Sequence, residues 1–168
     1  MSSPSDLSPD AHAGEKLLLL MRVGRIIASD LKLFEMLQKT ADAIHELLGY
    51  PNVDLPLVDE RDPETLVIRI RGGSYKERIR HEDRIAIARG VMGAAVRERK
   101  TQVVNDVAAD PRYVQPPSGL AVTSELAVPI LHAGRPLGVV NVEGDRPFTA
   151  VDVQLLELVA DHLAVAIE

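Results

Sequence analysis

The sequence predicts an α+β fold: a central antiparallel sheet with the N- and C-terminal helices on one face and shorter helical segments and loops on the other. Three observations support it. Apolar residues recur every three or four positions in two segments before residue 50, period-two alternation marks a hairpin within residues 124–143, and a capped apolar helix closes the chain. One sheet covered on both faces is the simplest packing for this order of elements.

The N-terminal segment is expected to stand apart from the fold. Residues 1–13 are rich in Ser and Pro and poor in apolar side chains, which predicts a disordered leader. The remaining residues, 14–168, suit a single domain, because one domain commonly holds roughly 100 to 200 residues.

Two helices are expected after the leader. The first spans 15–28, and the second starts behind a cap at Ser29 or Asp30 and ends at Gly49. Each carries an apolar stripe at helical spacing: Leu17, Leu20, Met21, Gly24 and Ile27 in the first, and Phe34, Leu37, Ala41, Ile44 and Leu48 in the second.

The middle of the chain mixes short elements. Strands are predicted at 53–58 and 66–70, with Pro56 marking an edge, a bulge or a later start because proline cannot donate to a ladder. Gly72 and Gly73 predict a turn. Further strands at 85–88 and 101–104 flank a helix at 91–99, followed by a single turn at 110–114 and a mobile loop at 116–119.

The closing segment gives the clearest local signals. Leu126, Val128 and Ile130 alternate with polar or small residues, as in a strand with one buried face, and Ala133-Gly134 supplies the turn into a second strand through residue 143. Thr149 and Asp152 then form a capping-box start for the last helix. Its apolar stripe is Leu156, Val159, Leu163 and Ile167.

Composition excludes several classes of protein. The chain has no cysteine, so disulfides, thiolate catalysis and cysteine-bound metals are impossible. Few aromatic residues and a net charge of -6 argue against nucleic-acid binding. No apolar run approaches the ~18 residues of a membrane span, and no secretory signal is present, so we expect a cytoplasmic protein without membrane contact.

Charge is unevenly distributed along the chain. Between residues 69 and 112 basic side chains outnumber acidic ones, although the whole chain is acidic. Arginines at the mouth of a pocket would suit a small anionic ligand, whereas the same side chains could simply form solvated faces. Both interpretations stay open.

Several motifs carry a family resemblance. Gly90-Val91-Met92-Gly93, Asp110-Pro111-Arg112-Tyr113, the hairpin from Ser124 and the Phe148-Thr149 helix start resemble the GAF family of small-molecule-sensing domains over about residues 30–168. The resemblance implies a GAF/PAS-like ligand pocket between the sheet and the middle segment. The residues that match it here are Met92, Asp106, Tyr113, Ser124, Glu125 and Asn141.

Each of these residues also has an ordinary interpretation. Glu125 could accept hydrogen bonds from an amine-bearing ligand, or it could be solvated like most strand glutamates. Asp106 could cap the following turn. Tyr113 could contact a ligand or close a small core.

Enzymatic and metal-dependent functions find little support in the residues. Free methionine sulfoxide reductases share the family fold and the Ser124-Glu125 type of motif, but their chemistry uses cysteines, and their acidic residue near position 141 is an amide here. Bilin attachment likewise needs a thiol, and the signature of cyclic-nucleotide-binding relatives is not recognisable. We therefore expect no enzyme. The histidines show no metal-ligand spacing, and only His81 or His132 could hold a haem.

Three functions remain. The first is a sensor that binds a small molecule and relays its occupancy through the terminal helices, as a homodimer formed by those helices, to an output domain or to a partner protein. The second is a dimerisation or docking module without a ligand. The third is a haem-binding redox or gas sensor. The sequence leaves the ligand and any cofactor open.

Overall fold

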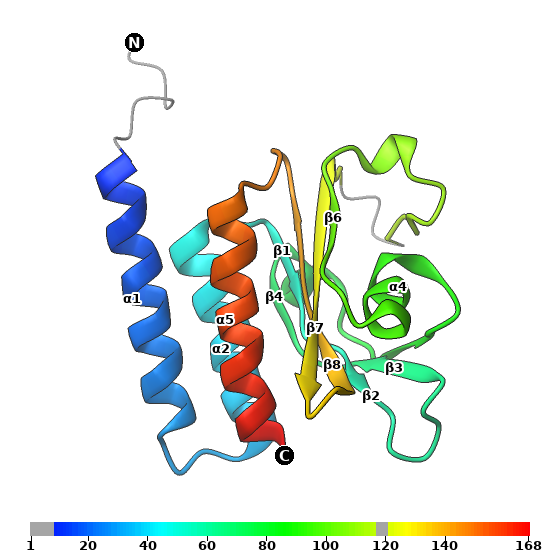
Figure 1. The fold of residues 1–168 in the computed structure, drawn as a ribbon, viewed down its shortest axis with the longest axis horizontal. Helices are drawn as coiled ribbons and strands as arrows, with labels where there is room; N and C mark the ends of the chain where they lie inside the picture. Colours follow the sequence, from blue (N-terminus) through cyan, green and yellow to red (C-terminus); the bar gives the residue numbers. More distant parts are fainter. Residues whose placement is uncertain (1–8, 117–120) are drawn as a thin grey trace.

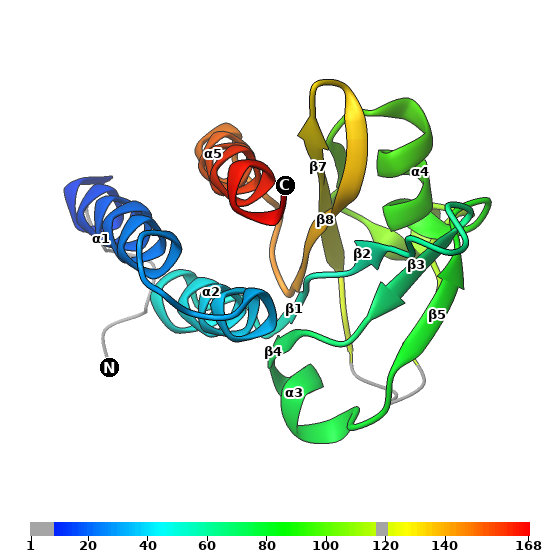
Figure 2. The same cartoon turned by 90° about the horizontal axis from the view of Figure 1, so that it is seen from below.

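The computed structural model describes residues 9–116 and 121–168 of the chain, and it confirms the α+β fold. Within these residues, eight strands form one antiparallel sheet in the order β4-β1-β8-β2-β3-β5, and β7 pairs with β8 on one side and β6 on the other. Helices α1, α2 and α5 lie on one face of the sheet, and α4 lies on the other (Figures 1 and 2).

Helix α1 (Pro9–Ile27) differs from its prediction at its start and in its buried face. Residues 9–13, expected in the leader, are helical, while the rest of that leader lies outside the described residues. The predicted stripe is wrong at Leu17 and Met21, which are exposed, whereas Leu20 and Ile27 are half-buried against the core and the fully buried residues are Leu19 and Val23. Helix α1 packs against both α2 and α5, and that position selects a different face than helical spacing alone predicted.

The other two long helices match the sequence more closely. Helix α2 (Leu33–Leu48) ends at Gly49 as predicted, but its N-cap is Lys32 without a side-chain hydrogen bond, so the predicted cap at Ser29 or Asp30 is wrong. Helix α5 (Ala150–Ile167) begins with the predicted capping box, in which Thr149 and Asp152 satisfy each other's backbone amides.

The predicted hairpin is confirmed as β7 (Ser124–His132) and β8 (Arg135–Gly144). Ala133 and Gly134 both have positive φ angles, 49° and 78°, as a two-residue hairpin turn of matching twist requires. The strands alternate as predicted, but both of their faces are buried in the middle, because helices cover one face and α4 covers the other.

The proline at position 56 interrupts a predicted strand. The segment forms β1 (Asn52–Asp54) and β2 (Leu57–Val58), which both pair with β8. Between them the Pro56 carbonyl accepts a hydrogen bond from the Val139 amide at 3.0 Å. A side chain at Gly138 would lie 2.4 Å from that carbonyl, so only glycine allows this approach.

The remaining elements are short. Strand β3 (Thr65–Ile68) leads into β4 (Arg71–Gly73), which pairs with β1 where a turn at Gly72-Gly73 was predicted. Helix α3 (Ser74–Arg78) was not predicted. Next come β5 (Asp83–Ala86), α4 (Gly90–Glu98), β6 (Gln102–Val104) and the 3₁₀ turn η1 (Val107–Ala109). The predicted mobile loop at 116–119 lies almost wholly outside the described residues.

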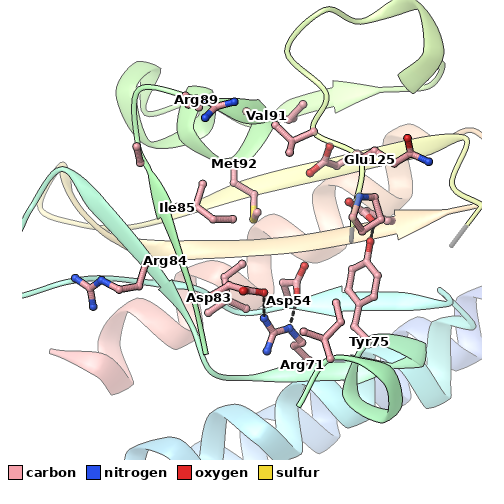
Figure 3. Close-up of a pocket in the computed structure, with 18 residues that line it drawn as sticks. Asp54, Arg71, Tyr75, Asp83, Arg84, Ile85, Arg89, Val91, Met92 and Glu125 are labelled. Carbon is pink, nitrogen blue, oxygen red and sulfur yellow. Dashed lines mark hydrogen bonds and ion pairs between the residues drawn. The ribbon is translucent and has the colours of Figure 1, made fainter. Parts of the chain in front are cut away.

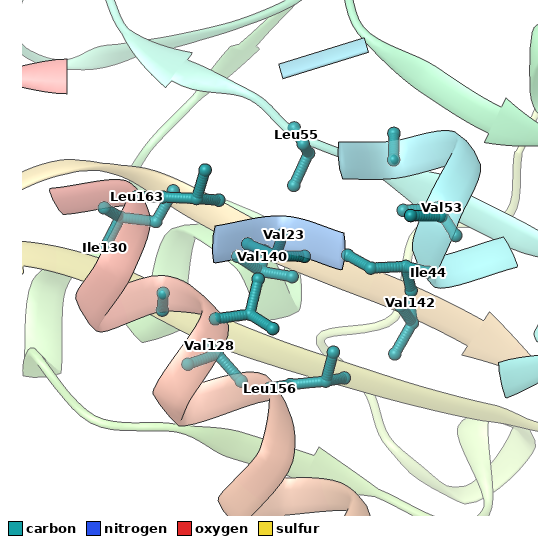
Figure 4. Close-up of a cluster of buried hydrophobic side chains, with 14 of the residues drawn as sticks. Val23, Ile44, Val53, Leu55, Val128, Ile130, Val140, Val142, Leu156 and Leu163 are labelled. Atoms are coloured by element: carbon teal, nitrogen blue, oxygen red, sulfur yellow. The ribbon is translucent and has the colours of Figure 1, made fainter. Parts of the chain in front are cut away.

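Two clusters of buried apolar side chains lie on the two faces of the sheet, beneath the helices that cover them. The larger lies between the three long helices and β1, β7 and β8, with Val23, Ile44, Val140 and Leu156 at its centre (Figure 4). The smaller lies between α4 and the opposite face of the same strands, around Val91, Ala127 and Val139. No helix in the described part of the chain is both long and apolar enough to cross a membrane.

Candidate functional site

A cavity of about 440 Å³ lies on the face of the sheet opposite the long helices. Its floor is formed by β1, β4, β7 and β8, and its walls by α3, β5, α4 and the segment at residues 114–116 (Figure 3). The larger core covers the opposite face of the same strands, so the cavity floor is also the support of the helical layer.

Strand register gathers polar side chains on this floor. Asp54 of β1 lies opposite Arg71 of β4 on one side and Asn141 of β8 on the other. Glu125 of β7 lies opposite Glu143 of β8. Directly paired residues project from the same face of a sheet, and positions two apart along a strand share that face, so Asn141 and Glu143 belong to one polar surface.

The acidic side chains of the floor are buried. Asp54, Glu125 and Glu143 are only 4–5% exposed. Buried carboxyl groups are costly unless they are paired, hydrogen-bonded or neutral. Their surroundings therefore determine what the cavity can bind.

Arg71 is the buried cation of the site. Its Nε lies 3.6 Å from Asp54 Oδ1, its Nη2 donates to Asp83 Oδ2 at 2.6 Å, and its Nη1 donates to the His81 carbonyl at 2.8 Å (Figure 3). Only its Nε faces Asp54, while its two terminal nitrogens hold the segment that leads into β5. One guanidinium thus joins the floor to the wall.

Helix α3 supplies the side chain that donates a hydrogen bond to Glu143. The Tyr75 hydroxyl donates a hydrogen bond to Glu143 Oε2, and its ring is buried. The position of the helix is fixed by the Ser74 amide, which donates to the Pro51 carbonyl at 2.9 Å.

Burial raises the pKa values of the three carboxyl groups of the floor and so favours their neutral, protonated forms. It raises the pKa of Asp54 to about 7, with Arg71 offsetting part of the rise. It raises the pKa of Glu125 to about 8, and the nearby charge of Asp54 adds to the rise. Burial and Asp54 also raise the pKa of Glu143 well above its ordinary value.

The floor also holds polar atoms without a hydrogen-bond partner. Asn141 is fully buried, and in the described part of the chain its side-chain nitrogen and oxygen have no partner at hydrogen-bond distance, although Asn141 lies near enough to Asp54 and Glu125 to lower the pKa of both. The Oδ1 atoms of Asp54 and Asn52 are also without a hydrogen-bond partner among these residues. Most buried polar side-chain atoms are satisfied in folded proteins, so a group of unsatisfied atoms beside a cavity indicates a site where a bound molecule would supply the partners.

The upper part of the cavity is apolar, with charge at its rim. Met92 extends from α4 between Ile85 and Glu125 (Figure 3). The other apolar side chains that line the cavity are Ile68 at the end of β3, Ile79, Val91 and Val114. Of the two arginines that also line it, Arg84 pairs with Asp59, whereas Arg89 has no ion-pair partner in the described part of the chain.

The structure separates the residues that the resemblance grouped together. Met92 and Glu125 line the cavity, and Asn141 lies in its floor beside Asp54. Tyr113 is half-buried against the smaller core, near enough to Glu125 for that charge to help raise its pKa.

The other predicted site residues do not line the cavity. The Ser124 hydroxyl donates to the Arg146 carbonyl at 2.6 Å, which fixes the turn after β8. Asp106 is exposed and begins η1 without the side-chain cap considered for it. His81 and His132, the candidate haem ligands, do not line the cavity either.

Sequence reasoning missed much of the site. Asp54 and Glu143 were read as parts of strands, Arg71 was considered only as one of the arginines that would suit an anionic ligand, and Tyr75 and Asp83 were given no role in a site. One signal was available: Asn141 and Glu143 occupy alternate positions in an otherwise apolar strand, which places two polar groups on one face.

This arrangement favours a positively charged group at the floor and apolar contacts above it. Carboxyl oxygens accept hydrogen bonds, and an ammonium group donates three. Because the chain contains no cysteine, any reaction in this cavity would proceed without a thiol of the protein.

Comparison with known proteins agrees with the architecture. The structure is similar to a free methionine-R-sulfoxide reductase from Neisseria meningitidis in complex with its substrate, with 27% identity, a TM-score of 0.81, and coverage of 99% of this chain and 96% of that one. It is also similar to the GAF domain of a phosphoenolpyruvate-protein phosphotransferase from Coxiella burnetii, with 19% identity, a TM-score of 0.82, and coverage of 92% and 94%. No curated protein matched.

The reductases contradict the prediction that the chain is not an enzyme. Structures of such reductases from Staphylococcus aureus and Thermoplasma acidophilum are also similar to it, at 23% and 21% identity. The fold therefore includes enzymes, and an enzymatic activity is compatible with this chain. The absence of cysteine excluded thiol chemistry and could not exclude catalysis in general.

The match to a family model covers most of the chain. The model described as the GAF domain matches residues 31–168, which include the whole sheet, the cavity and α5. The chain therefore belongs to the GAF family of ligand-binding signalling domains.

Proposed function

We propose that the chain is a regulatory GAF domain whose cavity binds a small molecule that carries a protonated amino group. The observation that supports this most directly is the floor: three buried carboxyl groups beside an asparagine whose polar atoms have no partner at hydrogen-bond distance among the described residues. An ammonium group would supply hydrogen bonds and positive charge to the same few atoms.

An amino acid or a closely related zwitterion fits the cavity best. The amino group would lie on the carboxyl floor, the apolar side chain would lie against Met92 and Ile85, and a carboxylate could reach Arg89 at the rim. This arrangement replaces the anionic ligand considered from the arginines alone. The reductase from Neisseria meningitidis, whose name identifies a free amino-acid derivative as its substrate, supports this class of ligand.

Occupancy can reach the helical layer through Arg71. Its side chain faces Asp54 at the cavity, while its carbonyl accepts a hydrogen bond from Gln38 of α2 at 2.8 Å. A ligand changes the helices only to the extent that it binds two of their arrangements unequally. A contact that spans both layers provides a physical route for that difference.

The output of the domain remains a prediction. We expect a homodimer through the terminal helices, because α1 exposes Leu17, Leu18 and Met21 and α5 exposes Leu158 and Val165. An output domain or a partner protein in trans, and a cytoplasmic location, are likewise expected. Light scattering tests the dimer, which a monomer at every concentration would exclude.

Thermal-shift screening tests the ligand class. The panel contains the common amino acids, primary alkylamines, nucleotides and keto acids. A ligand at 100 times its Kd stabilises the folded state by about 2.7 kcal/mol. For a domain of this size that corresponds to a rise in Tm of roughly 5–10 °C. Amines and amino acids should stabilise the protein; a response to keto acids alone would contradict the proposal.

A matched pair of variants assigns the response to the floor. Glu143→Gln keeps the shape of the side chain and removes a carboxyl group that can become a carboxylate beside a bound ammonium group, so it should weaken the response to amines. Glu60→Gln changes an exposed glutamate outside this cavity and should leave the response unchanged. Equal responses in both variants would place the binding elsewhere.

A further inference from the structure

Two carboxyl groups of the floor face each other across a strand pair. Glu125 and Glu143 are direct partners in the ladder between β7 and β8, and both are nearly fully buried. Side chains in direct cross-strand pairs begin about 5 Å apart, so two ionised carboxylates at these positions would repel each other. Burial strengthens that repulsion, because little water screens it.

This pair of glutamates makes no ion pair with a basic side chain in the described part of the chain, residues 9–116 and 121–168. The contact made by Glu143 is with a neutral donor, the Tyr75 hydroxyl. The buried guanidinium of the site, Arg71, is directed to Asp54 and Asp83 instead. Two adjacent buried carboxylates without a cation cannot both keep their charge at neutral pH.

We propose that the empty cavity holds a proton on the pair formed by Glu125 and Glu143, and that the ammonium group of the ligand replaces this proton on binding. The inference rests on the proposed amine ligand and adds how its binding is regulated. An O–H bond of one carboxylic acid breaks, its proton passes to water or buffer, and the resulting carboxylate accepts an N–H hydrogen bond. No electrons are transferred, and the charge inside the cavity stays the same.

Other charged and titratable groups face this pair from every neighbouring element. Asp54 adds negative charge and raises the pKa of both glutamates, and Arg112 lowers that of Glu125 slightly. These groups are Asp54 on β1, Arg71 on β4, Tyr75 on α3, Asp83 and Arg84 on β5, Arg89 before α4, and Asp110, Arg112 and Tyr113 before β7. Burial outweighs the basic members, since the pKa of Glu125 rises to about 8 and that of Glu143 well above its ordinary value.

The sign of the pH dependence follows. Below pH 8 the pair keeps its proton in the empty cavity, so an entering ammonium group must displace it, and binding weakens as the pH falls. If one proton is released for each amine bound, the Kd should decrease about tenfold for each unit by which the pH rises between 6 and 7.5. A simple alkylammonium stays protonated until about pH 10, like that of lysine, so its own titration does not interfere.

Isothermal titration calorimetry with n-butylamine tests the exchange. The titration is run on the full chain at pH 6.5 in two buffers with different enthalpies of ionisation, and the difference in heat counts the protons released. We expect about one proton per bound amine and a Kd that tightens with pH. Binding whose heat is independent of the buffer and whose Kd is constant from pH 6 to 7.5 would overturn the exchange and leave the amine site standing.

Variants assign the proton. Glu125→Gln should abolish the release and flatten the pH dependence, while Glu60→Gln should keep both as in the wild type. Circular dichroism verifies that the variants fold. Continued release of one proton from the Glu125→Gln protein would overturn the assignment to the pair. Absence of n-butylamine binding to the wild type would overturn the proposed function and the exchange together, a result distinct from binding without release.

Discussion

Replacing Glu125 by glutamine should make the folded state less sensitive to pH. In the unfolded chain Glu125 titrates near its ordinary pKa of 4.5, whereas in the fold burial raises that pKa to about 8. Between pH 5 and 7 the folded state therefore keeps a proton that the unfolded state releases. Stability falls as the pH rises wherever the folded state binds more protons.

The size of the effect follows from the width of that window. One proton difference changes the free energy of unfolding by about 1.4 kcal/mol per pH unit, so Glu125 removes roughly 3 kcal/mol of stability between pH 5 and 7. Asp54 acts in the same direction, because its pKa is raised from 3.8 to about 7. The Glu125→Gln protein lacks the contribution of Glu125 and keeps that of Asp54. Between pH 5 and 7 its free energy of unfolding should therefore fall by about 3 kcal/mol less than that of the wild type.

Urea denaturation at pH 5, 6 and 7 measures this difference. Circular dichroism is the suitable probe, because the chain contains no tryptophan for fluorescence. The Glu60→Gln protein, altered at an exposed site, should follow the wild type at every pH. Identical pH dependence in the Glu125→Gln and wild-type proteins would refute the claim that Glu125 is protonated in the fold.

Three further substitutions test the packing around the site. Tyr75→Phe leaves Glu143 without its donor and should cost about 1–3 kcal/mol at pH 7, measured by urea denaturation. Thr149→Ala removes the capping box of α5 and should cost about 1 kcal/mol; an unchanged Tm would contradict the role of the cap. Gly138→Ala places a Cβ 2.4 Å from the Pro56 carbonyl and should destabilise the fold by about 1–3 kcal/mol, whereas Gly24→Ala, with free space around it, should stabilise α1.

The elements that the sequence predicted correctly are those with local causes. The hairpin depends on its own two-residue turn and alternating strands, and α5 depends on Thr149 and Asp152, which lie three residues apart. Where the outcome depends on distant packing, the predictions were wrong. The buried face of α1 is chosen by α2 and α5, and β4 forms because β1 lies beside it.

The same distinction explains what was missed in the site. Met92 and Glu125 came from motifs close in sequence, whereas Asp54 and Glu143 become site residues only when strand register brings them beside Asn141 and Glu125. A polar residue on a strand is ordinarily solvated, and nothing local shows that α3 and α4 will cover it. The burial that raises the pKa values of these carboxyl groups is thus a property of the folded arrangement.

The two faces of β7 and β8 connect ligand binding to the helices. Glu125 and Ala127 face the cavity side, while Leu126 and Val128, which alternate with them, pack in the larger core with Leu156 and Leu163 of α5. Protein interiors are close-packed and barely compressible, so a shift of these strands cannot be absorbed within the core. If a bound ammonium group draws Glu125 and Glu143 together and shifts their strands, the neighbouring core residues Leu126 and Val142 shift against α5. A ligand that moves the floor therefore changes the packing of α5 and, through it, of α1.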